Sequence, residues 1–294
     1  MAMRSWLFVP GDSEKKLSKV AGCGADVVIV DLEDAVSPQS KAVARQMTHD
    51  WLRTHQQQLL AGGGHGRWVR INALGTQLWR DDLAAVMPAR PDGIMVPKAA
   101  GPDQLRLLAA ELLQHEQRNG IQPGTTRILP LVSETPAAAL GIPAYADAQQ
   151  PRLAGLTWGA EDLSAAIGAS RKRDSQGEWT DAFRMVRANV LLAAHAAGVL
   201  AVDTLHADFR DSEGLKRIAA NSYADGFNGM MAIHPDQVPI INAAYTPGEE
   251  DIARARAIVN AFSANPGAGA LQLDGRMIDQ PHLEQARKLL ENLR

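Results

Sequence analysis

Eight short apolar runs alternate with helix-compatible segments before residue 245, and this rhythm restricts the possible folds more than any other feature of the chain. Parallel strands joined through helices need right-handed crossovers, and eight such units are typical of a closed (β/α)₈ or TIM barrel of the α/β class. A doubly wound open sheet is the alternative, although it does not require eight units. The runs are 5–9, 27–30, 67–71, 93–96, 128–132, 154–158, 200–203 and 226–233.

The last fifty residues exceed what a barrel needs. They contain two helix-compatible segments, 247–264 and 281–293, separated by a stretch rich in small residues, a turn and a short extended piece. We therefore expect a barrel over 1–245 and a C-terminal helical extension over 246–294. The extension either folds over its own barrel or reaches the active-site mouth of a neighbouring subunit.

Carboxylates follow the fifth and sixth runs where each run ends: Glu134 after one, Glu161 and Asp162 after the other. The segment between them begins with Thr135-Pro136, a favourable N-cap and first helical residue. A strand–helix–strand unit places its two strands parallel and side by side, so these carboxylates should meet at the C-terminal edge of the sheet. Two converging carboxylates favour a hard divalent cation such as Mg²⁺. Alternatively, Glu134 only stabilises the start of the following helix.

Charged residues end other runs at the same expected edge. Asp31, Glu33 and Asp34 follow the second run, and crowding three carboxylates is unfavourable unless a cation or hydrogen-bond donors share them. Arg70 lies at the end of the third run. It is either an ion-pair partner of Asp31 or Glu33, or a planar donor to a carboxylate or a developing enolate. His234 follows the eighth run and is a metal ligand, a base, or a hydrogen-bonded histidine at a helix start.

Lys15 and Lys19 lie one turn apart on the helix that follows the first run. They form either a solvated basic face or a contact for phosphate groups at the rim of the site. The glycine-rich link at 62–66 lacks the spacing and the preceding strand of a nucleotide-binding loop.

Composition narrows the remaining function classes. The net charge of −3 does not favour binding to nucleic acid or to an anionic membrane. Cys23 is the only cysteine, which excludes an internal disulfide and argues against a thiolate metal site. No apolar stretch approaches the length of a signal peptide or a transmembrane helix, so we expect a cytoplasmic protein.

Assembled in order, these residues resemble the citrate lyase β-subunit-like family within the HpcH/HpaI aldolase group. The resemblance implies a TIM barrel, Mg²⁺, a CoA-thioester substrate and a homotrimer or hexamer. The reaction it implies is carbon–carbon cleavage of a 3-hydroxyacyl-CoA, such as citramalyl-CoA or malyl-CoA, to acetyl-CoA (or a homologue) and a 2-oxo acid. The matching segments are RSWLFVPGDSEKKLSK, VVIVDLEDAV, VRINA, GIMVPKA, LVSETPAAAL, GAEDL, AVDT, AIHPDQV, YTPGEEDI and GRMIDQPHLEQA.

The resemblance also implies roles for the acidic residues. Glu134 and Asp162 match Mg²⁺ ligands, and Glu134 thereby also contacts the substrate. Glu33 and Asp34 match groups that hold metal-bound waters. Asp279 matches a catalytic aspartate that the tail of a neighbouring subunit delivers to the site.

Basic residues acquire roles in the same way. Arg70 matches a catalytic arginine that binds the substrate and stabilises the enolate. Lys15 and Lys19 match positions that contact coenzyme A phosphates. The pair His234-Pro235 resembles stand-alone CoA-ester lyases, whereas subunits of multi-component citrate lyase tend to carry Asn-Pro there.

Three other functions share much of this pattern. A metal-dependent aldolase of pyruvate adducts would use the same carboxylates and Arg70 without needing Lys15 and Lys19. A malyl-CoA-type thioesterase would hydrolyse the same ester. A non-catalytic CoA-ester-binding protein or complex subunit would not need intact metal carboxylates.

Overall fold

The computed structural model of the chain describes residues 3–20, 22–60 and 65–291. It divides into two compact units, Met3–Ala243 and a second unit that begins at Ala244.

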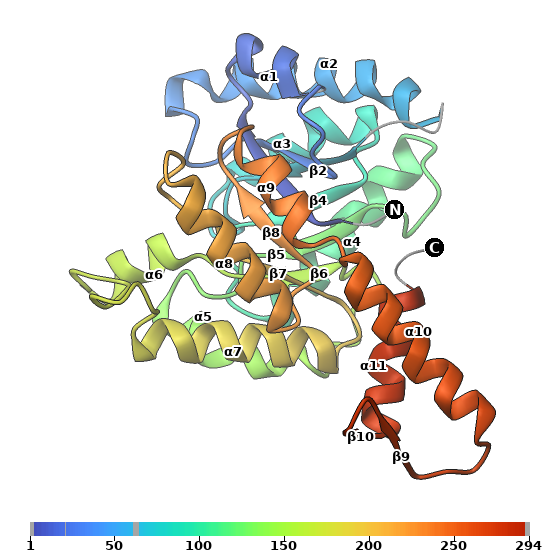
Figure 1. Cartoon of the computed structure of the whole chain (residues 1–294). Coiled ribbons are helices and arrows are strands. Elements are labelled where there is room, and N and C mark those ends of the chain that lie inside the picture. Colours follow the sequence, from blue (N-terminus) through green and yellow to red (C-terminus); the bar gives the residue numbers. More distant parts are fainter. Residues whose placement is uncertain (1–2, 21, 61–64, 292–294) are drawn as a thin grey trace. The chain divides into compact units, whose positions relative to one another are not determined.

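The first unit contains eight parallel strands with helices around their outside (Figure 1). The predicted (β/α)₈ barrel is confirmed. Hydrogen-bonded neighbours follow the order β5-β4-β3-β2-β1-β8-β7-β6. The strands are β1 (Ser5–Pro10), β2 (Val27–Asp31), β3 (Gly66–Arg70), β4 (Gly93–Val96), β5 (Arg127–Pro130), β6 (Gly155–Thr157), β7 (Leu200–Asp203) and β8 (Gly229–Ala232).

The barrel closes between β5 and β6 through two isolated parallel bridges, Ile128 to Leu153 and Leu131 to Thr157. The backbone N–H of Val132 donates to Thr157 O at 3.0 Å, which extends this contact toward the C-terminal edge. The strands flanking Thr135-Pro136 are therefore parallel neighbours, as expected. Thr135 accepts a hydrogen bond from Ala138 N, which confirms it as the N-cap of the intervening helix.

Helices connect successive strands and cover the barrel. They are α1 (Glu14–Val20), α2 (Lys41–Leu60), α3 (Leu78–Val86), α4 (Pro102–Arg118), α5 (Pro136–Gly141), α6 (Ala160–Ala166), α7 (Asp181–Ala196), α8 (Ser212–Ala224) and α9 (Gln237–Ala244), with 3₁₀ turns η1 (Pro38–Ser40), η2 (Met87–Ala89) and η3 (Ile142–Tyr145).

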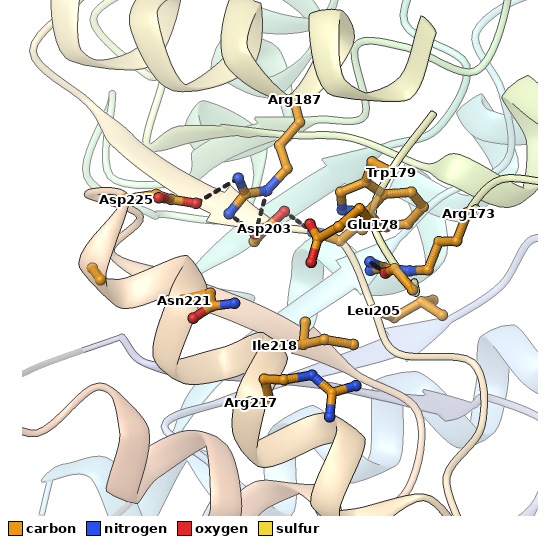
Figure 2. Close-up of a pocket in the computed structure, with 13 residues that line it drawn as sticks. Arg173, Glu178, Trp179, Arg187, Asp203, Leu205, Arg217, Ile218, Asn221 and Asp225 are labelled. Carbon is orange, nitrogen blue, oxygen red and sulfur yellow. Dashed lines mark hydrogen bonds and ion pairs between the residues drawn. The ribbon is translucent and has the colours of Figure 1, made fainter. Parts of the chain in front are cut away.

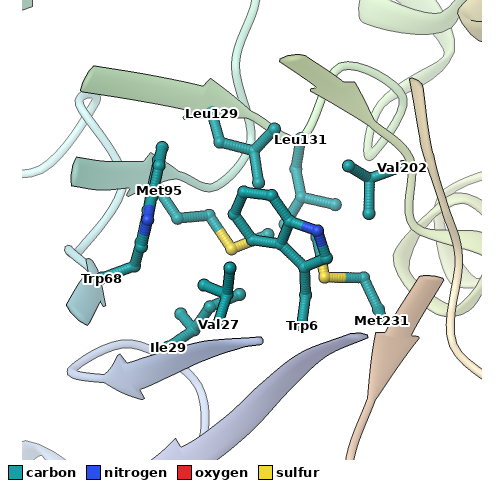
Figure 3. Packing of buried hydrophobic residues seen from close by; sticks show 9 residues of the cluster. All are labelled: Trp6, Val27, Ile29, Trp68, Met95, Leu129, Leu131, Val202 and Met231. Atoms are coloured by element: carbon teal, nitrogen blue, oxygen red, sulfur yellow. The ribbon is translucent and has the colours of Figure 1, made fainter. Parts of the chain in front are cut away.

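Large apolar side chains fill the barrel interior and converge between the strands (Figure 3). Trp6 and Trp68 meet edge to face with ring centroids 5.1 Å apart. Gly93 makes room for this packing, since a Cβ atom there would lie 2.4 Å from the Trp68 ring. All five residues of β2 are buried, as expected for a parallel strand covered on both faces.

Several element boundaries differ from the sequence-based expectation, which places the first helix over 14–23 and the third and eighth strands over 67–71 and 226–233. Helix α1 ends at Val20, because Gly22 and Cys23 form turns back to the preceding helical residues. Strand β8 starts at Gly229 rather than Gly226, where a φ of 103° continues the turn after α8. The glycine-rich link at 62–66 lies mostly outside the described residues; Gly66 opens β3.

The second unit contains α10 (Glu249–Ala264), the antiparallel hairpin β9 (Ala270–Leu273) and β10 (Arg276–Asp279), and α11 (Gln280–Glu291). The expected turn and extended piece form the turn and the second strand of this hairpin, whereas β9 lies in the stretch rich in small residues, where no strand is expected from the sequence. Its loop residues Asp274 and Gly275 both have positive φ, which suits a two-residue connection. The unit has its own small core, to which β10 and α11 contribute Ile278 and Leu283. No helix of the described chain has the length and apolarity needed to cross a membrane.

Candidate active site

Charged side chains from five consecutive βα units lie at the C-terminal edge of the barrel. Because parallel strands end at the same face, residues far apart in sequence come together there. The residues that follow β2 to β6 at this edge are Asp31, Glu33, Asp34, Arg70, Lys98, Glu134 and Asp162.

Arg70 and Asp31 form a bidentate ion pair at the ends of β3 and β2. Arg70 Nε donates to Asp31 Oδ1 at 2.7 Å, and Nη2 donates to Oδ2 at 2.6 Å. Arg70 Nη1 lies 3.3 Å from Glu33 Oε2, and the guanidinium packs over the Phe8 ring at 4.9 Å. The ion pair considered from the sequence therefore exists. It uses Nε and Nη2 of the guanidinium and leaves Nη1 directed toward the other carboxylates.

Lys98 is a residue of this edge to which sequence reasoning gave no role. Its Nζ donates to Glu33 Oε1, and it lies 3.0 Å from Asp34 Oδ2. Its backbone N–H donates to Glu134 Oε2. These contacts require a left-handed backbone, with φ of 51° at Lys98. Lys98 thus joins the β2 carboxylates to Glu134, and Arg70 and Lys98 together supply the cations that the crowded acids need.

Lys41 holds the backbone of the loop that carries Glu33, and sequence reasoning gave this residue no role either. Its Nζ donates to the backbone oxygens of Leu32 and Glu33, both at 2.7 Å, and to Asn72 Oδ1 at 2.8 Å. Asn72 is in turn held by the buried carboxylate of Asp82 at 2.7 Å. These bonds fix the backbone that carries Glu33. Ordinary helical lysines such as Lys41 give no signal in sequence for this kind of contact.

Glu134 is buried, with 4 % of its surface exposed, and faces Asp162 at the start of α6. The pKa of Glu134 is raised to about 8, mainly by burial; the Lys98 N–H lowers it, and the neighbouring carboxyl group of Asp162 raises it. The two carboxylates predicted to converge are therefore adjacent.

The donor set fits Mg²⁺. Two facing carboxylates repel one another, and a divalent cation shared by them would remove that repulsion. The buried Glu33 Oε2 atom accepts no hydrogen bond within the described chain, and it contacts Arg70 Nη1 through the ion pair at 3.3 Å. The described residues hold no cluster of three or more His, Cys, Asp or Glu side chains arranged for a metal. Mg²⁺ commonly takes one or two protein carboxylates and completes its shell with water and substrate oxygens, so the pair of Glu134 and Asp162 is a sufficient protein ligand set.

Neighbouring residues at the rim have more ordinary contacts. Glu161 is exposed and pairs with Lys172 rather than with Glu134. His234 accepts a hydrogen bond at Nδ1 from Asp236 N at 3.3 Å, and its ring stacks on Phe209 with centroids 5.0 Å apart. The structure thus favours the hydrogen-bonded histidine at a helix start.

The remaining predicted residues lie on the surface. Lys15 and Lys19 are exposed on α1, which follows the C-terminal end of β1. Asp279 ends β10 in the second unit. Its carboxylate Oδ1 lies 2.5 Å from His282 Nδ1.

A pocket of about 260 Å³ lies between α7, α8 and the loop at 173–179, and contains none of the predicted site residues. Figure 2 shows Arg187 directed between two carboxylates in this pocket. It bonds Asp203 at 2.9 Å and Asp225 at 2.7 Å. Asp203 also accepts from Trp158 Nε1 at 2.7 Å. Because these charges satisfy one another, the network anchors β7 and we do not assign the chemistry to it.

The chain is similar in sequence and in fold to known proteins. Residues 4–235 match the family described as HpcH/HpaI aldolase/citrate lyase. CitE from Mycobacterium tuberculosis, in complex with magnesium, acetoacetate and coenzyme A, is 35% identical with a TM-score of 0.78, over 99% of this chain and 97% of that one. Mitochondrial citramalyl-CoA lyase of Mus musculus is 32% identical over 98% of this chain and 85% of its own length. A (3S)-malyl-CoA thioesterase of Cereibacter sphaeroides is 33% identical over 98% and 93%.

Proposed function

The chain belongs to the HpcH/HpaI aldolase/citrate lyase family, and from this premise we propose that it is a Mg²⁺-dependent carbon–carbon lyase. Its substrate would be a 3-hydroxyacyl-CoA such as citramalyl-CoA or malyl-CoA. The products would be acetyl-CoA, or a homologue, and a 2-oxo acid. The observation that carries the proposal is the facing pair of Glu134 and Asp162 beside Arg70 at the C-terminal rim of the barrel.

Glu134 and Asp162 would hold the cation. When bound, Mg²⁺ supplies a Lewis acid that lowers the pKa of the substrate hydroxyl and neutralises the substrate carboxylate. Glu33 and Asp34 would accept hydrogen bonds from waters at the site, with Lys98 holding both carboxylates in place. CitE, which is similar to this chain, contains magnesium, and this supports the assignment.

Arg70 would bind the substrate and stabilise the thioester enolate. Cleavage leaves an electron pair on the α-carbon, and its negative charge is shared with the thioester oxygen. Asp31 fixes the guanidinium through Nε and Nη2, so Nη1 can be aimed without moving the group during the reaction. Such preorganised donors are usually the largest single contribution to catalysis of this kind.

Asp279 would take the proton that the substrate hydroxyl loses as the carbonyl forms and deliver it to the α-carbon of the enolate, in the active site of a neighbouring subunit. In β10 the buried Ile278 alternates with Met277 and Asp279, so these two share the opposite face of the strand. Met277 has 62 % of its surface exposed beside the acid. An apolar side chain next to a carboxylate on an outward face suits insertion into a partner, and we propose a homo-oligomer, a trimer or a hexamer.

Lys15 and Lys19 would contact the phosphates of coenzyme A. Both are exposed cations one turn apart on α1, which begins at the rim of the barrel. Coenzyme A is present in the similar CitE complex, which favours a thioester substrate over an aldolase acting on free pyruvate adducts.

A thioesterase is the second candidate, because a relative at 33% identity carries that name. A lyase releases acetyl-CoA and a 2-oxo acid, whereas a thioesterase releases free CoA and the intact hydroxy diacid. A non-catalytic CoA-ester-binding protein would release neither product.

The test is incubation of the full chain with a panel of 3-hydroxy-dicarboxyl-CoA esters, with Mg²⁺ or with a chelator, and mass spectrometry of the products. We expect acetyl-CoA, or its homologue, and a 2-oxo acid only with Mg²⁺. Free CoA with intact hydroxy diacid would establish the thioesterase instead. Unchanged esters throughout, under conditions where CoA esters raise Tm, would establish a binding protein.

A further inference from the structure

Asp279 and His282 form a carboxylate–imidazole pair at the junction of β10 and α11. His282 Nδ1 lies 2.5 Å from Asp279 Oδ1, and the Asp279 backbone N–H points at the same nitrogen from 3.3 Å. Both side chains are partly exposed, at 34 % for Asp279 and 41 % for His282. The imidazole thus contacts Oδ1, and the His282 backbone N–H also bonds the Asp279 carboxyl group.

The junction that carries this pair is rigid. Ile278 precedes Asp279 and Leu283 follows His282, and both are buried in the core of the second unit, with 2 % and 4 % exposed. Pro281 lies between the two partners, and its ring restricts the backbone at the first turn of α11. The positions of both backbones are therefore set by packing, and only the side-chain torsions remain to be fixed.

We propose that His282 is the positioning residue for Asp279: its Nδ1 holds Oδ1 and thereby presents Oδ2 to the substrate of the neighbouring subunit. The inference rests on the proposed function, in which Asp279 carries the proton. A freely rotating carboxylate offers either oxygen in several orientations, and misplacement of a reacting group lowers kcat steeply. The hydrogen bond from His282 is also the main reason why the pKa of Asp279 is lowered.

An ordinary helix cap is the competing explanation. A side chain at the third helical position that reaches back to the N-cap backbone N–H is half of a capping box. A cap contributes to stability, so its loss lowers the free energy of unfolding while folded molecules turn over normally. A positioning residue gives the opposite result, because its loss lowers kcat with little change in KM or Tm.

Two substitutions in the full chain separate these roles. His282→Leu removes the hydrogen bond, and His282→Asn keeps an N–H donor near the position of Nδ1 without an ionisable ring. We expect His282→Leu to lower kcat by roughly 10- to 100-fold with KM within about twofold, and His282→Asn to recover most of that loss. His195→Leu is the matched control, because it removes an exposed histidine hydrogen-bonded to Gly226 O at the end of α7.

Wild-type kcat in His282→Leu, or an equal loss in His282→Asn, would overturn the proposal. A second measurement does not need activity: the carboxyl carbon of Asp279 is followed by NMR during a pH titration of the free protein. We expect its midpoint to rise in His282→Leu and to stay near wild type in His282→Asn; an unmoved midpoint in both overturns the contact. If wild type cleaves no ester, the proposed function fails, and the titration still decides whether the pair exists.

Discussion

Two glutamates of the barrel, Glu116 and Glu134, are similarly buried, with 0 % and 4 % of their surfaces exposed. Their pKa values nevertheless move in opposite directions. The pKa of Glu116 is lowered to about 2, whereas that of Glu134 is raised to about 8. Burial raises both, so the difference comes from the partners that each carboxylate meets.

Glu116 has a complete set of partners. Arg152 binds it through both terminal nitrogens at 2.7 Å, and the backbone N–H groups of Gly124 and Thr126 donate at 2.8 and 3.0 Å. Arg152 and Thr126 precede β6 and β5, so this ion pair lies at the N-terminal end of the strands. That end of a TIM barrel usually serves stability.

Glu134 lies at the opposite end of β5 and has an incomplete set. It receives one backbone N–H, from Lys98, and faces the carboxyl group of Asp162. The protein holds this carboxylate in a place where it is unfavourable alone, which is typical of sites that bind a cation or do chemistry. A buried carboxylate therefore indicates function when the chain itself does not provide it with enough hydrogen-bond donors or a counter-charge.

Among the substitutions, Glu134→Ala should have the largest effect: it should abolish activity without destabilising the fold. Loss of a ligand to the cation should remove Mg²⁺-dependent turnover, with kcat/KM falling on the order of 10³-fold or more. The unfolding free energy should not fall, because the substitution removes repulsion with Asp162. Steady-state kinetics across a Mg²⁺ titration and thermal unfolding with and without Mg²⁺ measure both. Wild-type turnover in saturating Mg²⁺ would refute the ligand role.

Glu116→Gln should have the opposite effect and destabilise the fold without lowering activity. It leaves the buried Arg152 guanidinium without its counter-charge, and such losses reduce the unfolding free energy by about 3–5 kcal/mol. Turnover per folded molecule should match wild type, because the pair lies at the other end of the barrel. Denaturant unfolding and active-site-normalised kcat measure the two quantities. An unchanged denaturation midpoint would show that the ion pair does not stabilise the fold.

Acid pH should remove the stabilisation that Glu116 contributes to the fold. The pKa of Glu116 is lower in the folded protein, about 2, than its ordinary value of 4.5, so its stabilisation is complete above pH 5 and is lost as pH falls toward 2. The loss amounts to about 3 kcal/mol. Denaturation at a series of pH values should show this slope in wild type and a flatter one in Glu116→Gln. Parallel slopes in the two proteins would assign acid sensitivity to other groups.

Charge reversal at Lys15 or Lys19 should have the smallest effect. Exposed phosphate contacts contribute about 1 kcal/mol, so KM for the CoA ester should rise roughly fivefold, with kcat unchanged. The effect should shrink as ionic strength rises, since the contact is open to solvent. Kinetics at low and high salt measure it, with Lys16→Glu on the same helix as the control. Equal KM changes in all three variants would indicate general charge rather than a phosphate site.

Much of the candidate site followed from counting strands. Once eight βα units were recognised, Arg70, Glu134 and Asp162 had to emerge at one edge, because each follows its own strand. The bidentate contact of Arg70 with Asp31 was only one of two options from sequence. The role of Lys98 could not be predicted, since it depends on a left-handed backbone at that residue and on Glu134, 36 residues away.

The barrel, its acidic rim and the extension could be predicted from local periodicity and strand-end composition, because these patterns reflect interactions between residues close along the chain. Which acids find partners became visible only in the folded chain. Glu116 and Glu134 differ in this respect because Arg152 approaches one and Asp162 the other. A pKa depends on charges within a few ångströms, and those neighbours exist only after the barrel has closed.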